Sequence, residues 1–194
     1  WVYVSNNVNA AGDDAQARLA GLPPAAPPAI DRTAPPVPPA PPPPPPTPDL
    51  IDRVRTFLAP EIQQRLVTVE GDAQRLLIRI AGRGMFPSGS ATVEQGFVPL
   101  LNRIGQALRE EPGRVEVTGH SDNQPIRTVR FPSNFALSSA RAEAAKDIIA
   151  AATGQPARFT ATGRADTEPL VSNATPEGRE TNRRIEVVLI REGR

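Results

Sequence analysis

Apolar and polar residues alternate in several short stretches of this chain, and a period of two predicts β-strands. Apolar stretches at 66–69 and 76–80 flank Glu-Gly-Asp-Ala at 70–73, which predicts a β-hairpin. Three further strands are expected, at 115–119, 158–161 and 185–189.

Apolar residues spaced three and four apart predict helices around and between these strands. The apolar faces lie at 50–58, 93–111 and 134–152. Pro99 is compatible only with the first turns of a helix, so the regular part of the second helix is expected to start there. A short turn or helix is expected from Thr175, because a helix-capping residue is followed there by proline.

The predicted order is helix, β-hairpin, helix, strand, helix, strand and strand. A hairpin is antiparallel, whereas strands connected through a helix can pair in parallel, so a mixed sheet is expected. The fold class is therefore α+β: a hairpin plus parallel β-α-β crossovers, with helices packed mainly on one face of the sheet. The segment 49–194 is long enough to enclose one core.

Proline dominates residues 23–48, including an unbroken run from Pro41 to Pro46. Such a segment cannot bury a core or form the hydrogen bonds of helices and sheets. We interpret 10–48 as a disordered Pro-rich linker in polyproline II conformation, in which 23–48 can reach on the order of 80 Å. A ligand for a proline-binding groove is the alternative interpretation.

The apolar and aromatic stretch at 1–4 fits the end of a transmembrane helix, with 1–9 as the juxtamembrane segment. It fits equally the end of a strand or an arbitrary boundary. No run of 18 apolar residues exists in the sequence, so any membrane contact is expected only through a segment preceding residue 1.

Charge and composition exclude several classes of function. The formal net charge is +1, so no electrostatic case for nucleic acid follows. There is no cysteine and His120 is the one histidine, so neither thiol chemistry nor a zinc site is expected. The glycines at 82–89 form no phosphate-binding motif. We therefore expect no metal and no cofactor.

Two charged residues are the best candidates for chemistry. Asp122 follows directly after the strand at 115–119. Arg141 lies within the apolar face of the helix at 134–152, where a guanidinium needs a carboxylate, a phosphate or a ring of carbonyls. That apolar face consists of Leu137, Ala144, Ala145, Ile148 and Ala152. Periodicity leaves two interpretations open: a structural pair with Asp122, or a ligand-binding cation.

Five motifs carry a resemblance to a known family. They are Thr-Gly-His-Ser-Asp at 118–122, Asn134, Leu-Ser-x-x-Arg-Ala at 137–142, Gly-Arg-Ala-Asp at 163–166, and Gly-Arg-x-x-Asn-Arg-Arg-Ile-Glu at 178–186. In this order they resemble the OmpA-like peptidoglycan-binding domain, over roughly 65–191.

The resemblance implies a ligand and its contacts. Asp122 and Arg141 match the residues that grip the diaminopimelate of the peptidoglycan stem peptide in that family, and Asn134 matches a further pocket position. The resemblance also implies that Thr118 lines the same cleft. One of three consecutive residues would line it too: Asn182, Arg183 or Arg184. The loop at 86–91 lacks the aspartate often found there in the family, which argues against a ligand contact from that loop.

The segments 57–62, 86–91 and 122–134 are similar to the C-terminal extension of type VI secretion TssL (DotU/IcmH-like) proteins. This similarity implies a periplasmic domain that is tethered to the bacterial inner membrane by its N-terminal side. Its partners would be peptidoglycan and other subunits of the type VI secretion membrane complex. A wall anchor of the flagellar stator, similar to MotB, is the competing interpretation.

The expected function is therefore non-catalytic binding of peptidoglycan. A cell-wall hydrolase is one alternative, but no Gly-x-Ser-x-Gly motif accompanies Ser121, Ser138, His120 and Asp122. A protein-interaction module, with Asp122 and Arg141 as a purely structural pair, is the other alternative.

Overall fold

The computed structural model describes residues 49–191. The predictions for 1–9 and 10–48 lie outside the described residues. None of the helices between 49 and 191 is long and apolar enough to span a bilayer.

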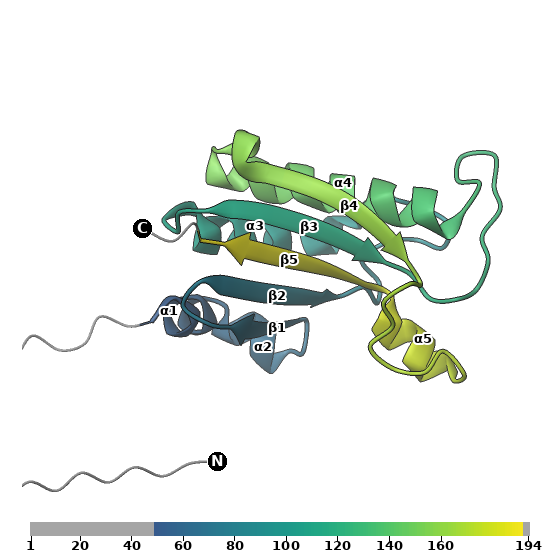
Figure 1. Ribbon diagram of the computed structural model, residues 1–194, viewed down its shortest axis with the longest axis horizontal. Helices are drawn as coiled ribbons and strands as arrows, with labels where there is room; N and C mark the ends of the chain where they lie inside the picture. The colour runs from purple at the N-terminus through teal and green to yellow at the C-terminus, as the bar shows by residue number, and fades with distance from the viewer. Residues whose placement is uncertain (1–48, 192–194) are drawn as a thin grey trace, which may run out of the picture. The chain divides into compact units, whose positions relative to one another are not determined.

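Five strands form one mixed sheet in the order β1-β2-β5-β3-β4 (Figure 1). The strands are β1 (Val67–Gly71), β2 (Arg75–Ala81), β3 (Arg114–His120), β4 (Phe159–Ala165) and β5 (Arg184–Ile190). β3 and β4 are parallel, and the other neighbours are antiparallel. The last strand of the chain thus lies in the middle of the sheet, between the hairpin and β3.

Helices cover mainly one face of this sheet, where α3 and α4 lie behind the strands in Figure 1. The α-helices are α1 (Leu50–Phe57), α2 (Ala59–Gln63), α3 (Val98–Arg109), α4 (Asn134–Thr153) and α5 (Pro176–Asn182). Short 3-10 turns are η1 (Gln95–Phe97) and η2 (Pro156–Arg158). The predicted α+β class with a mixed sheet is confirmed.

Proline marks where two of the helices in the predicted helical regions begin. The helix expected at 50–58 ends at Phe57, and a second helix starts at Ala59 with Pro60 in its first turn. The regular part of the helix expected at 93–111 starts at Val98, with Pro99 in its first turn. Proline has no N–H to donate, so it is accommodated at helix starts.

Close backbone approach holds α4 against β3 and β4. A Cβ on Gly119 of β3 would lie 2.2 Å from the carbonyl oxygen of Ser138. A Cβ on Gly163 of β4 would lie 2.3 Å from Ser139 Oγ. Only glycine permits this contact, and it places the first half of α4 beside the ends of both strands.

The buried face of α4 differs from the predicted one. It consists of Leu137, Ser138, Ala142, Ala145, Ile149, Ala150 and Thr153. Arg141 is therefore partly buried at the edge of this face and not in its middle. Alanines surround the whole helix, so hydrophobicity alone does not mark the side that packs, whereas the small residues opposite Gly119 do.

Candidate functional site

Asp122 is fixed just beyond the end of β3. The Ser121 N–H donates to the carbonyl of Ala165, at 2.8 Å, which joins this turn to the end of β4. The Gln124 N–H donates to Asp122 Oδ1 at 2.9 Å, an Asx turn that orients the carboxylate. The residue is only 7% exposed.

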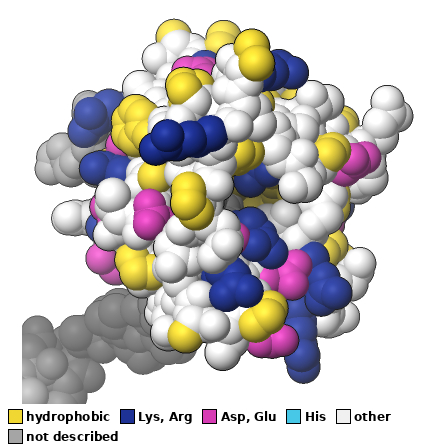
Figure 2. Space-filling view, turned by 90° about the vertical axis from the view of Figure 1, so that its right-hand side faces the viewer, with side chains coloured by type: hydrophobic (Ala, Val, Ile, Leu, Met, Phe, Trp, Pro, Cys, Tyr) yellow, Lys and Arg dark blue, Asp and Glu magenta, His cyan; other side chains and the backbone are white. Residues whose placement is uncertain are grey.

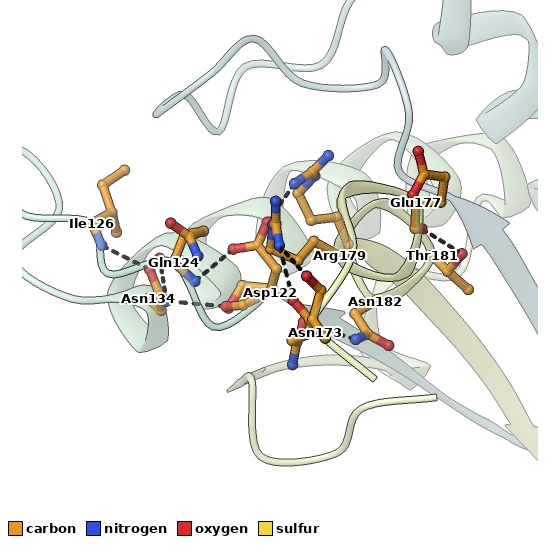
Figure 3. Close-up of polar contacts among 12 residues, drawn as sticks. Asp122, Gln124, Ile126, Asn134, Asn173, Glu177, Arg179, Thr181 and Asn182 are labelled. Carbon is orange, nitrogen blue, oxygen red and sulfur yellow. Dashed lines mark hydrogen bonds and ion pairs between the residues drawn. The ribbon is translucent and has the colours of Figure 1, made fainter. Parts of the chain in front are cut away.

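Asn134, the first residue of α4, braces the loop that follows Asp122 (Figure 3). Its Nδ2 donates to the carbonyls of Asp122 at 3.2 Å and Gln124 at 2.9 Å. Its Oδ1 accepts from the Ile126 N–H at 3.1 Å. These contacts connect the start of α4 to the Asp122 turn.

Arg141 extends from α4 to the loop at 82–90. Its Nε donates to the Ser90 carbonyl at 2.8 Å, and its Nη2 donates to the Pro87 carbonyl at 3.3 Å. The guanidinium carbon lies 5.0 Å from the centre of the Phe86 ring. No carboxylate within the described residues pairs with Arg141, so the structural pair with Asp122 that was one interpretation does not form.

Arg183 supplies the partner of Asp122 instead. It lies between α5 and β5, and its guanidinium forms an ion pair with Asp122 Oδ2. The Gly82 N–H donates to the Arg183 carbonyl at 3.0 Å. A Cβ on Gly82 would lie 2.2 Å from that carbonyl oxygen, so glycine lets the loop at 82–90 approach β5.

These side chains surround one cavity of about 490 Å³, called the main cavity below. Its walls come from the loop at 82–89, from 121–126, from α4 and from the segment around α5. Figure 2 views this end of the molecule and shows basic and acidic side chains gathered around a hollow. The charged residues that line it are Arg83, Asp122, Arg141, Glu180 and Arg183.

The charges around the main cavity are not matched locally. Burial is the main cause that lowers the pKa of Arg141, and the neighbouring positive charge of Arg183 lowers it further, while Asp122 opposes both. Arg141 is therefore a partly desolvated cation beside a second cation. An anion that entered the main cavity would stabilise both positive charges.

Comparison with known proteins bears directly on this arrangement. Residues 85–183 match the OmpA family. The chain belongs to the OmpA family. Most residues that line the main cavity thus fall within the segment that matches the family, and the resemblance noted in the sequence is confirmed.

Three similar proteins illustrate the relationship. The cell wall anchor of the type VI secretion system from Pseudomonas aeruginosa is 50% identical with a TM-score of 0.68, covering 72% of this chain and 97% of that one. Motility protein B from Bacillus subtilis is 34% identical over 143 residues, which are 73% of this chain and 55% of that protein. The peptidoglycan-binding protein ArfA from Mycobacterium bovis is 32% identical over 105 residues, 54% of this chain and 31% of that protein. This chain therefore spans about half or less of the latter two relatives.

Within this OmpA-family domain, Arg183 is the one of the three consecutive candidates that lines the main cavity, and three other candidate residues lie outside it. Thr118 and Arg184 do not line the main cavity, because strand alternation turns them with Glu186 toward the other face of the sheet. Arg184 is buried and donates to Glu186 Oε1 at 2.8 Å. Asn182 is fully buried beside Asn173 (Figure 3), where its Oδ1 accepts from the Leu170 N–H at 2.8 Å.

Other residues of the main cavity were missed by sequence reasoning. The missing aspartate argued against a ligand contact from the loop at 86–91, and Phe86, Ser88 and Gly89 of this loop line the cavity. Backbone carbonyls of this loop hold Arg141, so the missing aspartate does not remove the loop from the site. Glu180 also lines the cavity. In the sequence, the cluster of glycines at 82–89 was the one feature that could have indicated this wall of the main cavity.

His120 was expected to be a packed or hydrogen-bonded strand residue. It is 3% exposed, and its Nε2 lies 3.6 Å from Glu186 Oε2. Between residues 49 and 191, no group of three or more His, Cys, Asp or Glu side chains is arranged to hold a metal ion.

Proposed function

We propose that this chain binds peptidoglycan without cleaving it, through the diaminopimelate of the stem peptide. One observation carries the proposal: in the main cavity the Asp122 carboxylate lies next to two guanidinium groups, those of Arg141 and Arg183. The free end of diaminopimelate carries an ammonium group and a carboxylate on the same carbon. The charges of the cavity and of this ligand are complementary.

Each side chain has a defined role in this proposal. Asp122 accepts charge-assisted hydrogen bonds from the ligand ammonium, worth about 1.5–3 kcal/mol each when partly desolvated. Arg141 has five N–H donors, and the carbonyls of Ser90 and Pro87 occupy two of them. The remaining donors fork onto the ligand carboxylate. Asn134 keeps the Asp122 turn in place.

Arg183 has a second function in the bound state. It pairs with Asp122 and is partly exposed. When the ligand ammonium approaches Asp122, the guanidinium of Arg183 can shift part of its hydrogen bonding to the ligand carboxylate. Arg141 and Arg183 then hold the carboxylate from two sides, which selects a zwitterion over a simple amine.

The wider role follows from the named relatives. Identity of 50% with a cell wall anchor of the type VI secretion system favours the same role here: a periplasmic domain that anchors a secretion membrane complex to the wall. The tether would be an inner-membrane segment on the N-terminal side, and the protein partners would be other subunits of that complex. Similarity to motility protein B supports a flagellar stator anchor as the second candidate.

Binding without catalysis is favoured by the environment of the acids. A glycosidase needs two carboxyl groups that flank the scissile bond. The acids lining the main cavity are Asp122 and Glu180, and each is ion-paired with an arginine, Arg183 and Arg83 respectively. Both acids are thus paired with an arginine and not with each other.

A sedimentation assay with insoluble, diaminopimelate-containing peptidoglycan tests the proposal. We expect the wild-type protein to be retained, and both Asp122→Ala and Arg141→Ala to be lost to the supernatant with unchanged circular dichroism. Arg109→Ala, at an exposed position of α3 outside the main cavity, is the matched control and should be retained.

Two results would reject the proposal. Retention of both cavity variants would mean that the wall is not bound here, and the protein-interaction module would then be the better interpretation. Release of soluble fragments from the peptidoglycan by the wild-type protein would indicate a hydrolase. Competition by free diaminopimelate, which should elute the wild-type protein, tests the ligand directly.

A further inference from the structure

A second depression adjoins the main cavity, and we call it the side groove. It has a volume of about 240 Å³ and lies where β1 and β2 meet α5. Arg83 and Glu180 line both the side groove and the main cavity. Their side chains form an ion pair, with 3.4 Å between Arg83 Nε and Glu180 Oε1. One ion pair therefore stands between the two spaces.

The ion pair between Arg83 and Glu180 separates the two spaces only weakly. The Arg83 side chain is 82% exposed, and ion pairs in water contribute little because solvent screens them. Arg83 can thus turn away from Glu180 toward a ligand at small cost. A molecule held in the main cavity could extend past it into the side groove.

The side groove combines an apolar floor with a basic rim. Leu66 and Leu170 contribute apolar surface, and Leu170 is 42% exposed. Arg65 and Arg83 stand exposed at the rim. The two further arginines in the lining, Arg79 and Arg184, are already paired with Glu186. A small apolar group next to a carboxylate fits this combination.

Arg65 has a backbone conformation that points to a role for its side chain. It follows α2 with φ of 58°, in the left-handed region that glycine adopts without steric cost. The Arg65 N–H donates to the Ile62 carbonyl and the Leu66 N–H donates to the Glu61 carbonyl, the hydrogen bonds of a helix end at which glycine is usual. No acidic side chain in the described part of the chain pairs with Arg65. A long cation thus occupies a glycine position without a structural partner.

We propose that the side groove binds the residue that follows diaminopimelate in the stem peptide, the D-alanine that ends a tetrapeptide stem. The proposal rests on the function proposed above. The alanine methyl group lies on the floor near Leu170, and the terminal carboxylate is bound by Arg65 and by Arg83 after it leaves Glu180. The domain would then distinguish stem peptides by their length beyond diaminopimelate.

Titration calorimetry with three ligands tests this assignment. They are free diaminopimelate, the tripeptide stem that ends in diaminopimelate, and the tetrapeptide that adds D-alanine. We expect the wild-type chain to bind the tetrapeptide about tenfold more tightly than the tripeptide. Arg65→Gly should remove this preference while leaving the affinity for the tripeptide and free diaminopimelate within twofold.

Arg65→Gly is chosen because glycine suits the left-handed conformation, so loss of folding cannot explain its effect. Leu170→Ser should reduce the preference about threefold, since only the apolar contact is lost. Arg109→Gln, outside both spaces, is the control for removal of a positive charge and should keep the full preference.

The outcomes separate the two proposals. If Asp122→Ala abolishes binding of all three ligands but the wild-type chain does not prefer the tetrapeptide, the side groove assignment is wrong and the main cavity assignment stands. Equal weakening of the tripeptide and the tetrapeptide by Arg65→Gly also overturns it, because the groove would then hold the opposite arm of the peptide. Absence of binding to any of the three ligands refutes both proposals.

Discussion

β3 is preceded by one buried acid, Glu111, and followed by another, Asp122, and both lie beside arginines. Glu111 is 5% exposed and Asp122 is 7% exposed. At Glu111 both carboxylate oxygens are held: Oε1 accepts from Arg53 Nη2 at 2.6 Å, and Oε2 accepts from Arg191 Nη2 at 3.2 Å. These contacts join α1 and the end of β5 to the start of β3.

The same residue types have another consequence at the Asp122 end. Asp122 pairs with Arg183, but Arg141 is held by backbone carbonyls and faces a cavity. A carbonyl dipole neutralises less charge than a carboxylate, so part of the charge of Arg141 remains available for a ligand. The comparison teaches that a buried acid with arginines around it is not diagnostic of a site, whereas a desolvated cation beside a cavity is.

The largest expected effect comes from separating α4 from β3 at the Asp122 end. In Gly119→Ala the new methyl group would meet the Ser138 backbone at 2.2 Å, so α4 must shift. We expect the free energy of unfolding, from urea denaturation, to fall by about 3 kcal/mol. Gly96→Ala is the control because its Cβ meets nothing within 4 Å. An equally small effect of both substitutions would contradict the close approach described here.

Removing Glu111, the acid that precedes β3, should lower the stability of the fold and leave peptidoglycan binding unchanged. Glu111→Ala removes the carboxylate that Arg53 and Arg191 share, and we expect a loss of roughly 2 kcal/mol in urea unfolding. This is below the value for fully buried pairs because both arginines are partly exposed. The folded variant should still sediment with peptidoglycan; loss of that retention would break the comparison.

Exchange of arginine for lysine tests at which end of β3 the planar guanidinium group is required. Arg141→Lys keeps the charge but loses the donors for the ligand carboxylate, so the affinity for diaminopimelate should fall about tenfold, or about 1.4 kcal/mol. Arg53→Lys at the Glu111 end is the matched substitution and should leave the affinity unchanged. Equal affinities of both variants in calorimetry would mean that Arg141 does not contact the ligand carboxylate.

A third carboxylate, Glu186 of β5, should control stability in acid. Burial raises the pKa of Glu186, but His120, Arg184 and Arg79 lower it more, so its pKa in the folded chain lies below the ordinary value of 4.5. The unfolded chain then binds more protons below about pH 4.5, and stability is lost as the pH falls. Between about pH 5.5 and 3.5 the wild-type chain should lose about 1 kcal/mol more than Glu186→Gln. Equal losses in urea titrations would exclude this contribution.

Local patterns in the chain were sufficient for most of the secondary structure. Short apolar stretches anticipated all five strands, and those at 115–119 and 185–189 showed the period-two alternation that reports which residues face a core. The cap at Thr175 and the proline after it marked the start of α5, where Thr175 Oγ1 accepts from the Gly178 N–H. The apolar face of α4 was predicted incorrectly, because a helix rich in alanine has no strong periodic signal.

Some residues of the main cavity could be identified from the sequence, whereas others could be identified only from the folded chain. Asp122 and Arg141 could be named from the strand and helix patterns, and Asn134 could be named only from the resemblance to the OmpA-like domain. The choice among Asn182, Arg183 and Arg184 required the folded chain: α5 ends there and β5 begins, and this junction sends one side chain inward, one into the cavity and one to the far side of the sheet. The partner of Asp122 lies 61 residues away in sequence, and the two carbonyls that hold Arg141 lie 51 and 54 residues away. Contacts over such separations depend on how the strands and helices pack, which no local pattern encodes.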